Sequence, residues 1–307
     1  MFIVKYKKIF LSLSIILMIV SLIFIFTFGL KPGIDFRGGA LLEVSYSNSP
    51  SGRPEVSELE SMIKTLNIGQ ALIQPTGEND YFIKTRDLSE TERQNLSNAL
   101  SLSGKFPTEE KGFTSIGPSV GRDLARKAIL SIIFVITTII LFIAFSFRKV
   151  SSPSALGGQG VASWKYGVIT IITLLHDIVI PTGIFALLSY YTGAEVDTLF
   201  VLALLTILGL SVHDKIVVFD RIRENLKEED KRSFREIVGT STSQTIVRSI
   251  NITLTTIFVL IPLYLFGPET TKNFALILTI GLSFGIYSSL FFASPLLVFV
   301  EEWQKKK

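Results

Sequence analysis

Six long apolar stretches constrain this chain more than any other feature. A helix that crosses a bilayer needs about 20 mostly apolar residues, because its backbone must satisfy every hydrogen bond internally. Hydrophobic residues make up 48% of the 307 residues, and they are gathered in long runs, which favours a membrane bundle over a large soluble core. The predicted spans are Ile9–Leu30, Ala128–Phe147, Tyr166–Tyr190, Val196–Phe219, Arg248–Gly267 and Phe274–Phe299.

The first stretch could also be a secretory signal peptide, since Lys5, Lys7 and Lys8 precede it. Its apolar part, Ile9–Leu30, is longer than the core of about 7–15 residues that signal peptides use, and no small-residue cleavage pattern follows. We therefore expect a retained span, with residues 1–30 forming the N-terminus and the first transmembrane helix.

Positive charge is distributed unevenly between the two sides of the predicted spans. The short loops and termini on one side carry 15 Lys and Arg residues, whereas the short loops on the other side offer only Lys272. This bias predicts that both termini face the cytoplasm and that residues 31–127 lie outside. The charges on the cytoplasmic side are Lys5, Lys7, Lys8, Arg148, Lys149, Lys165, Arg221, Arg223, Lys227, Lys231, Arg232, Arg235, Lys305, Lys306 and Lys307.

The polar stretch 31–127 predicts a small α+β domain. Alternating strands and amphipathic helices in the order βαββαβ are typical of a ferredoxin-like fold. Nothing in this stretch looks catalytic, so we expect a module that binds or moves. The expected strands lie near Leu42–Tyr46, Ala71–Gln74, Tyr81–Thr85 and Gly112–Ile116, and the expected helices near Glu55–Leu66 and Ser89–Leu102, with Ser89 and Glu92 as a capping box.

The fold class predicted is therefore an all-α membrane bundle of six transmembrane helices, with this domain between helices 1 and 2. Residues 128–307 form the five-helix remainder, with a cytoplasmic loop at 220–247 and a cytoplasmic C-terminus. The loop 220–247 mixes both charge signs and is expected to form an amphipathic surface helix. The stretch Ser151–Gly160 is interpreted as a flexible linker without a specific role.

Ionisable residues interrupt three of the predicted spans. Their burial costs about 2.5–3.5 kcal/mol each on insertion scales, so they are candidates for a functional site. Helix directions place Asp214 and Arg248 near the same inner level, where they could form a pair, and place Asp177 somewhat further out. A buried carboxylate beside a cation can take up and release a proton, as a proton path requires. The residues concerned are His176 and Asp177, then His213, Asp214 and Lys215, then Arg248.

Other interpretations apply to single members of this set. Lys215 has a long stem that can reach the headgroups, so we assign it only an anchoring role. Arg248 could do the same, and His213 could simply hydrogen-bond a neighbouring helix. A divalent metal site between the two His-Asp pairs ranks low, because adjacent helical residues point about 100° apart. We predict no metal, no cofactor and no catalytic residue, since the chain lacks the nucleophile or H-E-x-x-H pattern of an intramembrane enzyme.

Several motifs give the chain a family resemblance. Gly33-Ile34-Asp35-Phe36-Arg37-Gly38-Gly39 follows the first span, Gly117-Pro118-Ser119-Val120-Gly121 precedes the second, and His176-Asp177 lies in the third. The fourth carries Val212-His213-Asp214-Lys215-Ile216-Val217-Val218-Phe219-Asp220-Arg221-Ile222-Arg223-Glu224-Asn225. In order and topology these resemble the SecF family, the smaller partner of the SecD/SecF pair in bacterial protein export.

The resemblance implies a resistance–nodulation–division type of fold and a subunit that uses the proton gradient to promote translocation across the cytoplasmic (inner) membrane. It implies SecD, the SecYEG translocon, YajC and the unfolded polypeptide as partners, and no nucleic acid. By the same resemblance Asp214 and Arg248 belong to the proton path. Asp177, which we also place on this path, matches the family's third-span carboxylate, whose role is less settled, and His213, where the family is expected to have a small polar residue such as Asn, could share the proton. Structural roles are implied for Gly33, Asp35, Gly38, Gly39, Arg221, Arg223 and Asn225.

A different class fits part of the pattern: a proton-coupled small-molecule or lipid exporter of the same superfamily. Such exporters usually hold two repeats in one chain and have larger external domains with a ligand cavity. The single short external domain predicted here argues against the exporter, but the exporter stays open as the alternative function.

Overall fold

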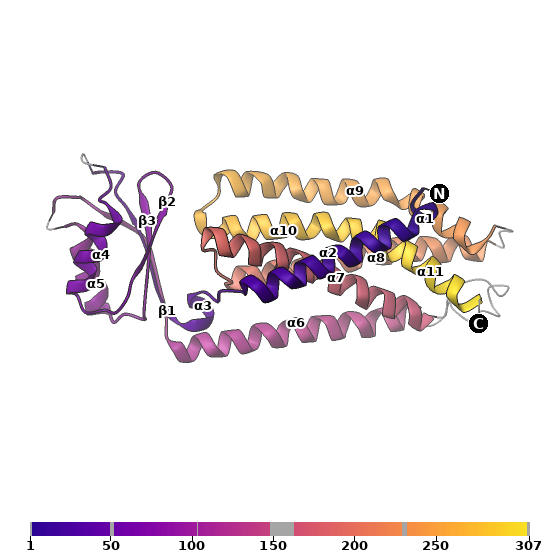
Figure 1. Ribbon diagram of the computed structural model, residues 1–307, viewed down its shortest axis with the longest axis horizontal. Coiled ribbons are helices and arrows are strands. Elements are labelled where there is room, and N and C mark those ends of the chain that lie inside the picture. The colour runs from indigo at the N-terminus through magenta and orange to yellow at the C-terminus, as the bar shows by residue number, and fades with distance from the viewer. Residues whose placement is uncertain (1, 50–51, 103, 148–162, 229–231, 306–307) are drawn as a thin grey trace. The chain divides into compact units, whose positions relative to one another are not determined.

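The chain folds into two compact units (Figure 1). The computed structural model describes residues 2–49, 52–102, 104–147, 163–228 and 232–305. One unit combines Met1–Lys31, Ser131–Ala194 and Leu199–Lys307, and the other combines Pro32–Leu130 with Glu195–Thr198. The predicted linker Ser151–Gly160 lies outside the described residues. The inclusion of Glu195–Thr198 in the small unit was not expected, since the fourth span was predicted to begin at Val196.

The small unit has the predicted βαββαβ order. Its sheet has the strand order β2-β3-β1-β4, and all three neighbouring pairs are antiparallel, as in a ferredoxin-like fold. The elements are β1 (Gly39–Ser45), α4 (Val56–Thr65), β2 (Leu72–Thr76), β3 (Asp80–Thr85), α5 (Glu90–Leu100) and β4 (Glu109–Ile116).

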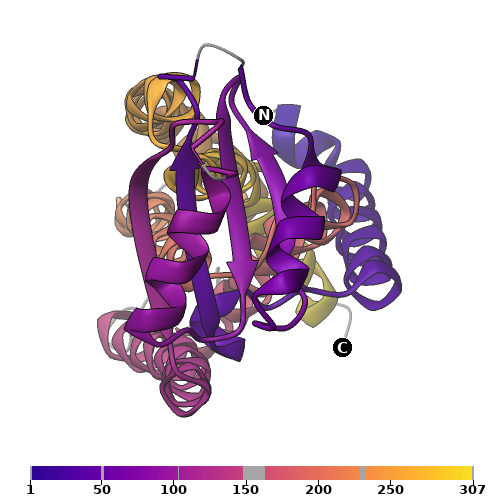
Figure 2. The ribbon, with the colours of Figure 1, turned by 90° about the vertical axis from the view of Figure 1, so that its left-hand side faces the viewer.

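Helices α4 and α5 cover one face of this sheet (Figure 2). Alternate residues of β1 face them, which is why Leu42 and Val44 are almost fully buried. Leu59 from α4 and Leu96 from α5 are buried completely in the same cluster. The alternation seen in the sequence thus corresponds to one buried face of the sheet.

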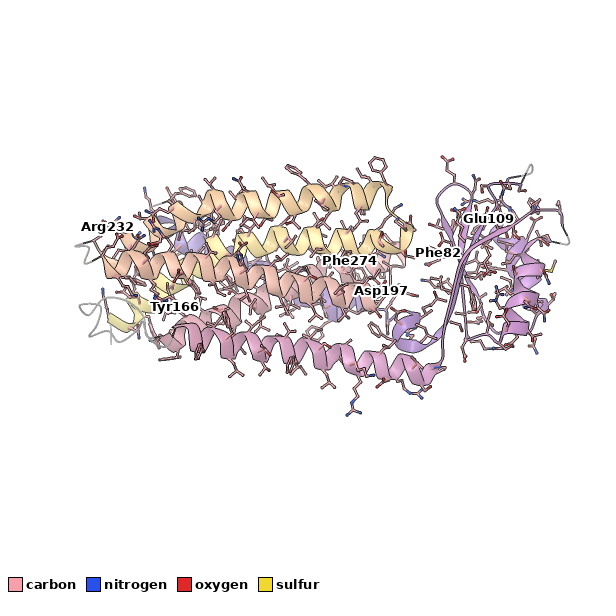
Figure 3. The ribbon with its side chains drawn as sticks, turned by 180° about the vertical axis from the view of Figure 1, so that it is seen from behind. Phe82, Glu109, Tyr166, Asp197, Arg232 and Phe274 are labelled. Carbon is pink, nitrogen blue, oxygen red and sulfur yellow. The ribbon has the colours of Figure 1, made fainter. Side chains whose placement is uncertain are left out.

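Six helices are long and apolar enough to cross a membrane, as predicted. Both chain ends lie at the same end of the bundle, which we call the terminal end (Figure 1). Tyr166 and Arg232 mark this end and Phe274 marks the opposite one (Figure 3). The helices are α1 (Phe2–Lys5), α2 (Lys7–Phe28), α6 (Pro118–Phe147), α7 (Ser163–Thr192), α8 (Thr198–Lys227), α9 (Phe234–Phe266), α10 (Glu269–Tyr287), the π-helix η2 (Ser288–Ala293) and α11 (Ser294–Lys305).

The most buried spans of the bundle are α7, α8 and the last span, Glu269–Lys305. The buried share of the apolar window is 56% for α7 and 50% for each of the other two, against 6% for α6. Helices α2 and α7 approach closely, because a Cβ atom on Gly183 would lie 2.6 Å from the Cα atom of Ser21. A small residue at this point allows the two backbones to pack together, as is common between membrane helices.

The prediction of a separate surface helix at 220–247 was wrong. Helix α8 continues to Lys227, and α9 already begins at Phe234. Ser233 and Glu236 form a capping box that starts α9. Arg248 therefore lies about four turns inside a long helix, by about 3.6 residues per turn, and not at its opening.

Candidate functional site

The most deeply buried charges in the bundle form an ion pair between α7 and α8. The Nζ atom of Lys215 lies 2.5 Å from Oδ2 of Asp177, and neither side chain is exposed at all. Leaving either charge there without its partner would be costly, because the surrounding helices exclude water. The two charges therefore stabilise the bundle only as a pair.

All three N–H donors of the Lys215 ammonium are used. Besides Asp177, they reach Oγ of Ser211 at 2.5 Å and Oγ of Ser288 at 3.1 Å. Ser211 in turn donates its hydroxyl hydrogen to Oδ2 of Asp177. Ser211 is one turn before Lys215 on α8, whereas Ser288 is the first residue of η2. The ammonium therefore connects α7, α8 and η2.

His176 completes this cluster from α7. Its Nδ1 atom lies 3.1 Å from Oδ1 of Asp177. A carboxylate can only accept hydrogen bonds, so an ionised Asp177 requires the hydrogen on Nδ1. Among the described residues, Nε2 is buried without a hydrogen-bond partner. The imidazole ring packs near Tyr287 and Phe292.

The interpretation of Lys215 as a headgroup anchor was therefore wrong. Depth along the helix allowed the side chain to reach the interface, but its direction around the helix decides its environment. Ser211 and Ser288 were also missed. The only signal for them in the sequence is the i, i+4 spacing of Ser211 and Lys215, which places both on one face of a helix.

Asp214 occupies a different side of α8. Its side chain is 10% exposed and lines a cavity of about 20 Å³, enough for roughly one water molecule. The other polar groups of the cavity come from Ser211, His213, Thr253 and Thr256. Within the described residues no Lys or Arg forms an ion pair with Asp214. Its carboxyl group is thus buried without a compensating cation in contact.

His213 also lines the cavity beside Asp214. Its side chain is 62% exposed, and Nδ1 is 4.0 Å from Oδ1 of Asp214, beyond hydrogen-bonding distance. This places the residue that the sequence left unassigned beside the carboxyl group, without a direct hydrogen bond to it.

Arg248 belongs to a second, more polar cleft of about 310 Å³. It lines this cleft with Asp220 and Glu224 of α8, and no ion pair to Asp214 occurs among the described residues. The antiparallel register explains the separation. Arg221 donates to Gln244 at 2.6 Å, so Arg248 lies roughly level with Val217, about one helical turn nearer the terminal end than Asp214.

The Asp-Arg-Ile-Arg-Glu-Asn run, residues 220–225, lies in the last two turns of α8 and binds the first part of α9. Asn225 is buried and donates from Nδ2 to Oγ of Ser241 at 2.7 Å and to Oε1 of Gln244 at 3.0 Å. Arg221 also binds Glu224, and Arg223 lies 3.5 Å from Asp220. The last two pairs lie within α8, whereas the bonds of Asn225 and Arg221 to Ser241 and Gln244 fix the register between α8 and α9 and so position Arg248 relative to Asp214.

The glycine-rich motif forms a tight junction in the small unit. Its central residues make a single-turn helix, α3 (Ile34–Arg37), between Gly33 and Gly38. Gly38 and Gly39 have φ of 82° and 137°, a region that favours glycine. The backbone N–H of Gly33 donates to Val196 at 2.8 Å, and Asp35 accepts from the N–H of Thr198 at 2.8 Å.

The start of α6 closes this junction. A Cβ atom on Gly121 would lie 2.7 Å from the backbone nitrogen of Gly38, and one on Gly38 would lie 2.7 Å from the Cα atom of Pro118. Three stretches that are distant in the sequence are therefore interlocked by backbone contacts, and the two glycine-containing motifs belong to one structural element.

Over the described ranges, no three His, Asp or Glu residues come together in a way that could hold an ion.

A bundle of six apolar helices with a buried ionisable cluster and a small α+β domain defines a multi-pass membrane protein with a polar site inside the membrane. Two family models match it: "Protein export membrane protein SecD/SecF, C-terminal" over residues 97–158 and 161–303, and "SecD/SecF GG Motif" over residues 23–50. The chain belongs to the SecD/SecF family of protein-export membrane proteins.

Curated relatives carry the name Protein translocase subunit SecF. The one from Thermobaculum terrenum is 38% identical over 99% of this chain and 94% of its own length. That from Anaerolinea thermophila is 34% identical over 97% and 94%. The resemblance to SecF that the motifs indicate is confirmed by these relatives.

The crystal structure of SecDF from Thermus thermophilus, described as a translocon-associated membrane protein, superimposes with a TM-score of 0.80 at 27% identity. The comparison covers 98% of this chain but only 38% of the SecDF chain. The present chain thus spans well under half of that protein.

Proposed function

We propose that this chain is a subunit of the Sec protein-export machinery that, together with SecD, uses the proton gradient to promote translocation of unfolded polypeptides across the cytoplasmic membrane. The curated relatives named as translocase subunits support the role in export. In this proposal the chain acts beside the SecYEG channel, with YajC as a further partner, and both termini face the cytoplasm.

The proposed need for SecD is supported by the length of the SecDF protein. This chain covers only 38% of it, so in this proposal SecD supplies the remaining part. Few of the apolar residues of α6 are buried within the chain itself, 6% of the window, which leaves this helix free to face lipid or a partner.

The observation that carries the proposed proton coupling is the environment of Asp214. Its carboxyl group is nearly buried, borders a cavity that fits about one water molecule, and has no ion-pair partner among the described Lys and Arg residues. Such a group is expected to exchange a proton more readily than a carboxylate held by an ammonium. Arg248, one turn away, supplies a cation that can approach when the helices move.

The test is proton-driven export by Asp214→Asn. The complex with SecD and SecYEG is reconstituted in vesicles, and translocation of an unfolded polypeptide is measured with and without a proton gradient. We expect the variant to assemble normally and to lose the stimulation by the gradient. Glu228→Gln, an exposed change just after the end of α8, is the matched control. Undiminished stimulation in Asp214→Asn would refute the proposal.

A further inference from the structure

Lys215 has every donor satisfied in a site that excludes water. Its ammonium is completely buried, and its three hydrogen bonds go to Asp177, Ser211 and Ser288. A lysine that merely spans the distance to the headgroups would keep its ammonium in water. The three oxygen acceptors instead form a socket that matches the three N–H groups of an ammonium ion.

Asp177 is equally well satisfied. Its Oδ2 atom accepts from Lys215 and Ser211, and its Oδ1 atom lies 3.1 Å from Nδ1 of His176. Every one of these partners donates, which is the pattern that an ionised carboxylate requires. The pair is therefore an ammonium and a carboxylate with no net charge.

The neighbourhood contains one other carboxyl group among the described residues, and it lacks these contacts. Asp214 precedes Lys215 on α8, and the ionisable side chain beside it is that of His213, whose Nδ1 atom lies 4.0 Å from Oδ1 of Asp214. From α10 the nearest titratable group is Tyr287, which stacks on His176 and hydrogen-bonds Ser14 at 3.4 Å. Arg248 of α9 faces the other cleft. Two carboxyl groups at similar depth thus differ in whether a cation holds them.

We propose that Lys215 is a positioning residue of the proton path: it stays charged, keeps Asp177 ionised and unavailable for proton transfer, and thereby restricts reversible proton binding to Asp214. This inference rests on the proposed function for its consequence in export, but the pair itself does not. It assigns Asp177 to a fixed electrostatic role, whereas the sequence alone placed Asp177 on the proton path.

The test compares Lys215→Met with the double variant Asp177→Asn/Lys215→Met in the complex with SecD in lipid nanodiscs. Breaking a buried pair leaves one uncompensated charge, whereas removing both charges leaves none. We expect Lys215→Met to lower the thermal unfolding midpoint by about 10 °C, and the double variant to recover most of this loss. If only the double variant assembles, the same conclusion follows.

Infrared spectroscopy supplies a measurement that a purely structural role would not change. In Lys215→Met the isolated Asp177 becomes protonated, since a buried carboxylate without a partner neutralises. We expect a new protonated-carboxyl band at neutral pH in Lys215→Met, and its disappearance in the double variant. Proton-driven export should be lost in the single variant and restored to at least about half in the double variant, because the paired charges cancel.

Three results would overturn the inference. An unaltered Lys215→Met protein would mean that the ammonium of Lys215 does not control the charge state of Asp177. A double variant as impaired as the single one would mean that Lys215 does not act through Asp177. A protonated-carboxyl band from Asp177 already present in the wild type would contradict the ionised pair. If the wild-type complex itself ignores the proton gradient, the proposed function fails, while the unfolding and infrared measurements still decide whether the pair exists.

Discussion

Asp214 and Lys215 are consecutive residues, yet their side chains lie on different sides of α8. Lys215 is enclosed by α7 and η2, and Asp214 borders the cavity shared with α9 and α10. Successive helical residues point about 100° apart, so one turn of α8 serves both environments. The ion pair of Lys215 and the unpaired carboxyl group of Asp214 are thereby carried by two consecutive residues.

Exchanging the charges of Asp214 and Arg248 tests whether these residues meet during the cycle. They are separated by about one turn in this structure, a distance that the long side chain of an arginine can span. We expect Asp214→Arg and Arg248→Asp each to abolish gradient-driven export, and the double exchange to recover part of it. Strictly additive losses would argue against direct pairing.

Replacing His213 tests whether it shares the proton. Its imidazole is mostly exposed and beyond hydrogen-bonding distance of Asp214. We therefore expect His213→Asn to keep gradient-driven export within about a factor of two of the wild type, which corresponds to about 0.4 kcal/mol. A loss as severe as that of Asp214→Asn would make His213 an obligatory proton carrier.

Gly183 tests the packing of α2 against α7. An added methyl group would lie 2.6 Å from the Cα atom of Ser21, so one helix must move. Gly183→Ala is expected to destabilise the protein by about 1–3 kcal/mol, as overpacking does. Gly209→Ala on α8 is the control, because no neighbouring atom lies within 4 Å of the position that its methyl group would take, and alanine is the better helix former. Equal unfolding midpoints for the two variants would contradict the close contact.

Glu92 gives the small domain a defined acid response. Hydrogen bonds from Arg86, and then from the backbone N–H and hydroxyl of Ser89, lower the pKa of Glu92 to about 2. The folded pKa is below the unfolded value of about 4.3. The stabilisation is therefore fully present above about pH 4.3 and is lost as the pH falls toward about 2.

This response can be followed by amide hydrogen exchange of α5, corrected for intrinsic rates. Glu92→Gln should reduce protection at neutral pH, and its difference from the wild type should vanish near pH 2. Glu60→Gln, on an exposed position of α4, is the control. A pH-independent difference would show that the charge of Glu92 does not support the helix.

The sequence predicted the larger features because they depend on local patterns. Apolar runs located six spans, and period-two alternation with the Ser89–Glu92 capping box located the strands and helices of the small domain. The start of α9 was missed because polar residues such as Ser241, Thr242 and Thr245 lie buried in this helix and lower its apolar signal. The capping box at Ser233 and Glu236 was the available clue.

The candidate site was predicted less completely. Hydropathy and helix direction give the depth of a residue, so Asp177 and Asp214 could be recognised as buried charges. They do not give its direction around the helix, which depends on which helices are neighbours. That is why the side chain of Lys215 was assigned to the headgroups. It is also why Arg248 was paired with Asp214, although it lies about one helical turn from the level of Asp214.

The π-helix η2 has a mechanical consequence for the last span. A π turn closes hydrogen bonds from i to i+5, so it accommodates one residue more than an α turn. If the π turn moved along the helix to a neighbouring turn, the residues between its old and new positions would rotate by about 100° and shift by about 1.5 Å, while the helix stayed wound. Ser288 begins η2 and accepts a hydrogen bond from Lys215. Such a rotation and shift of the segment would therefore directly change the hydrogen bonding of the Lys215 ammonium.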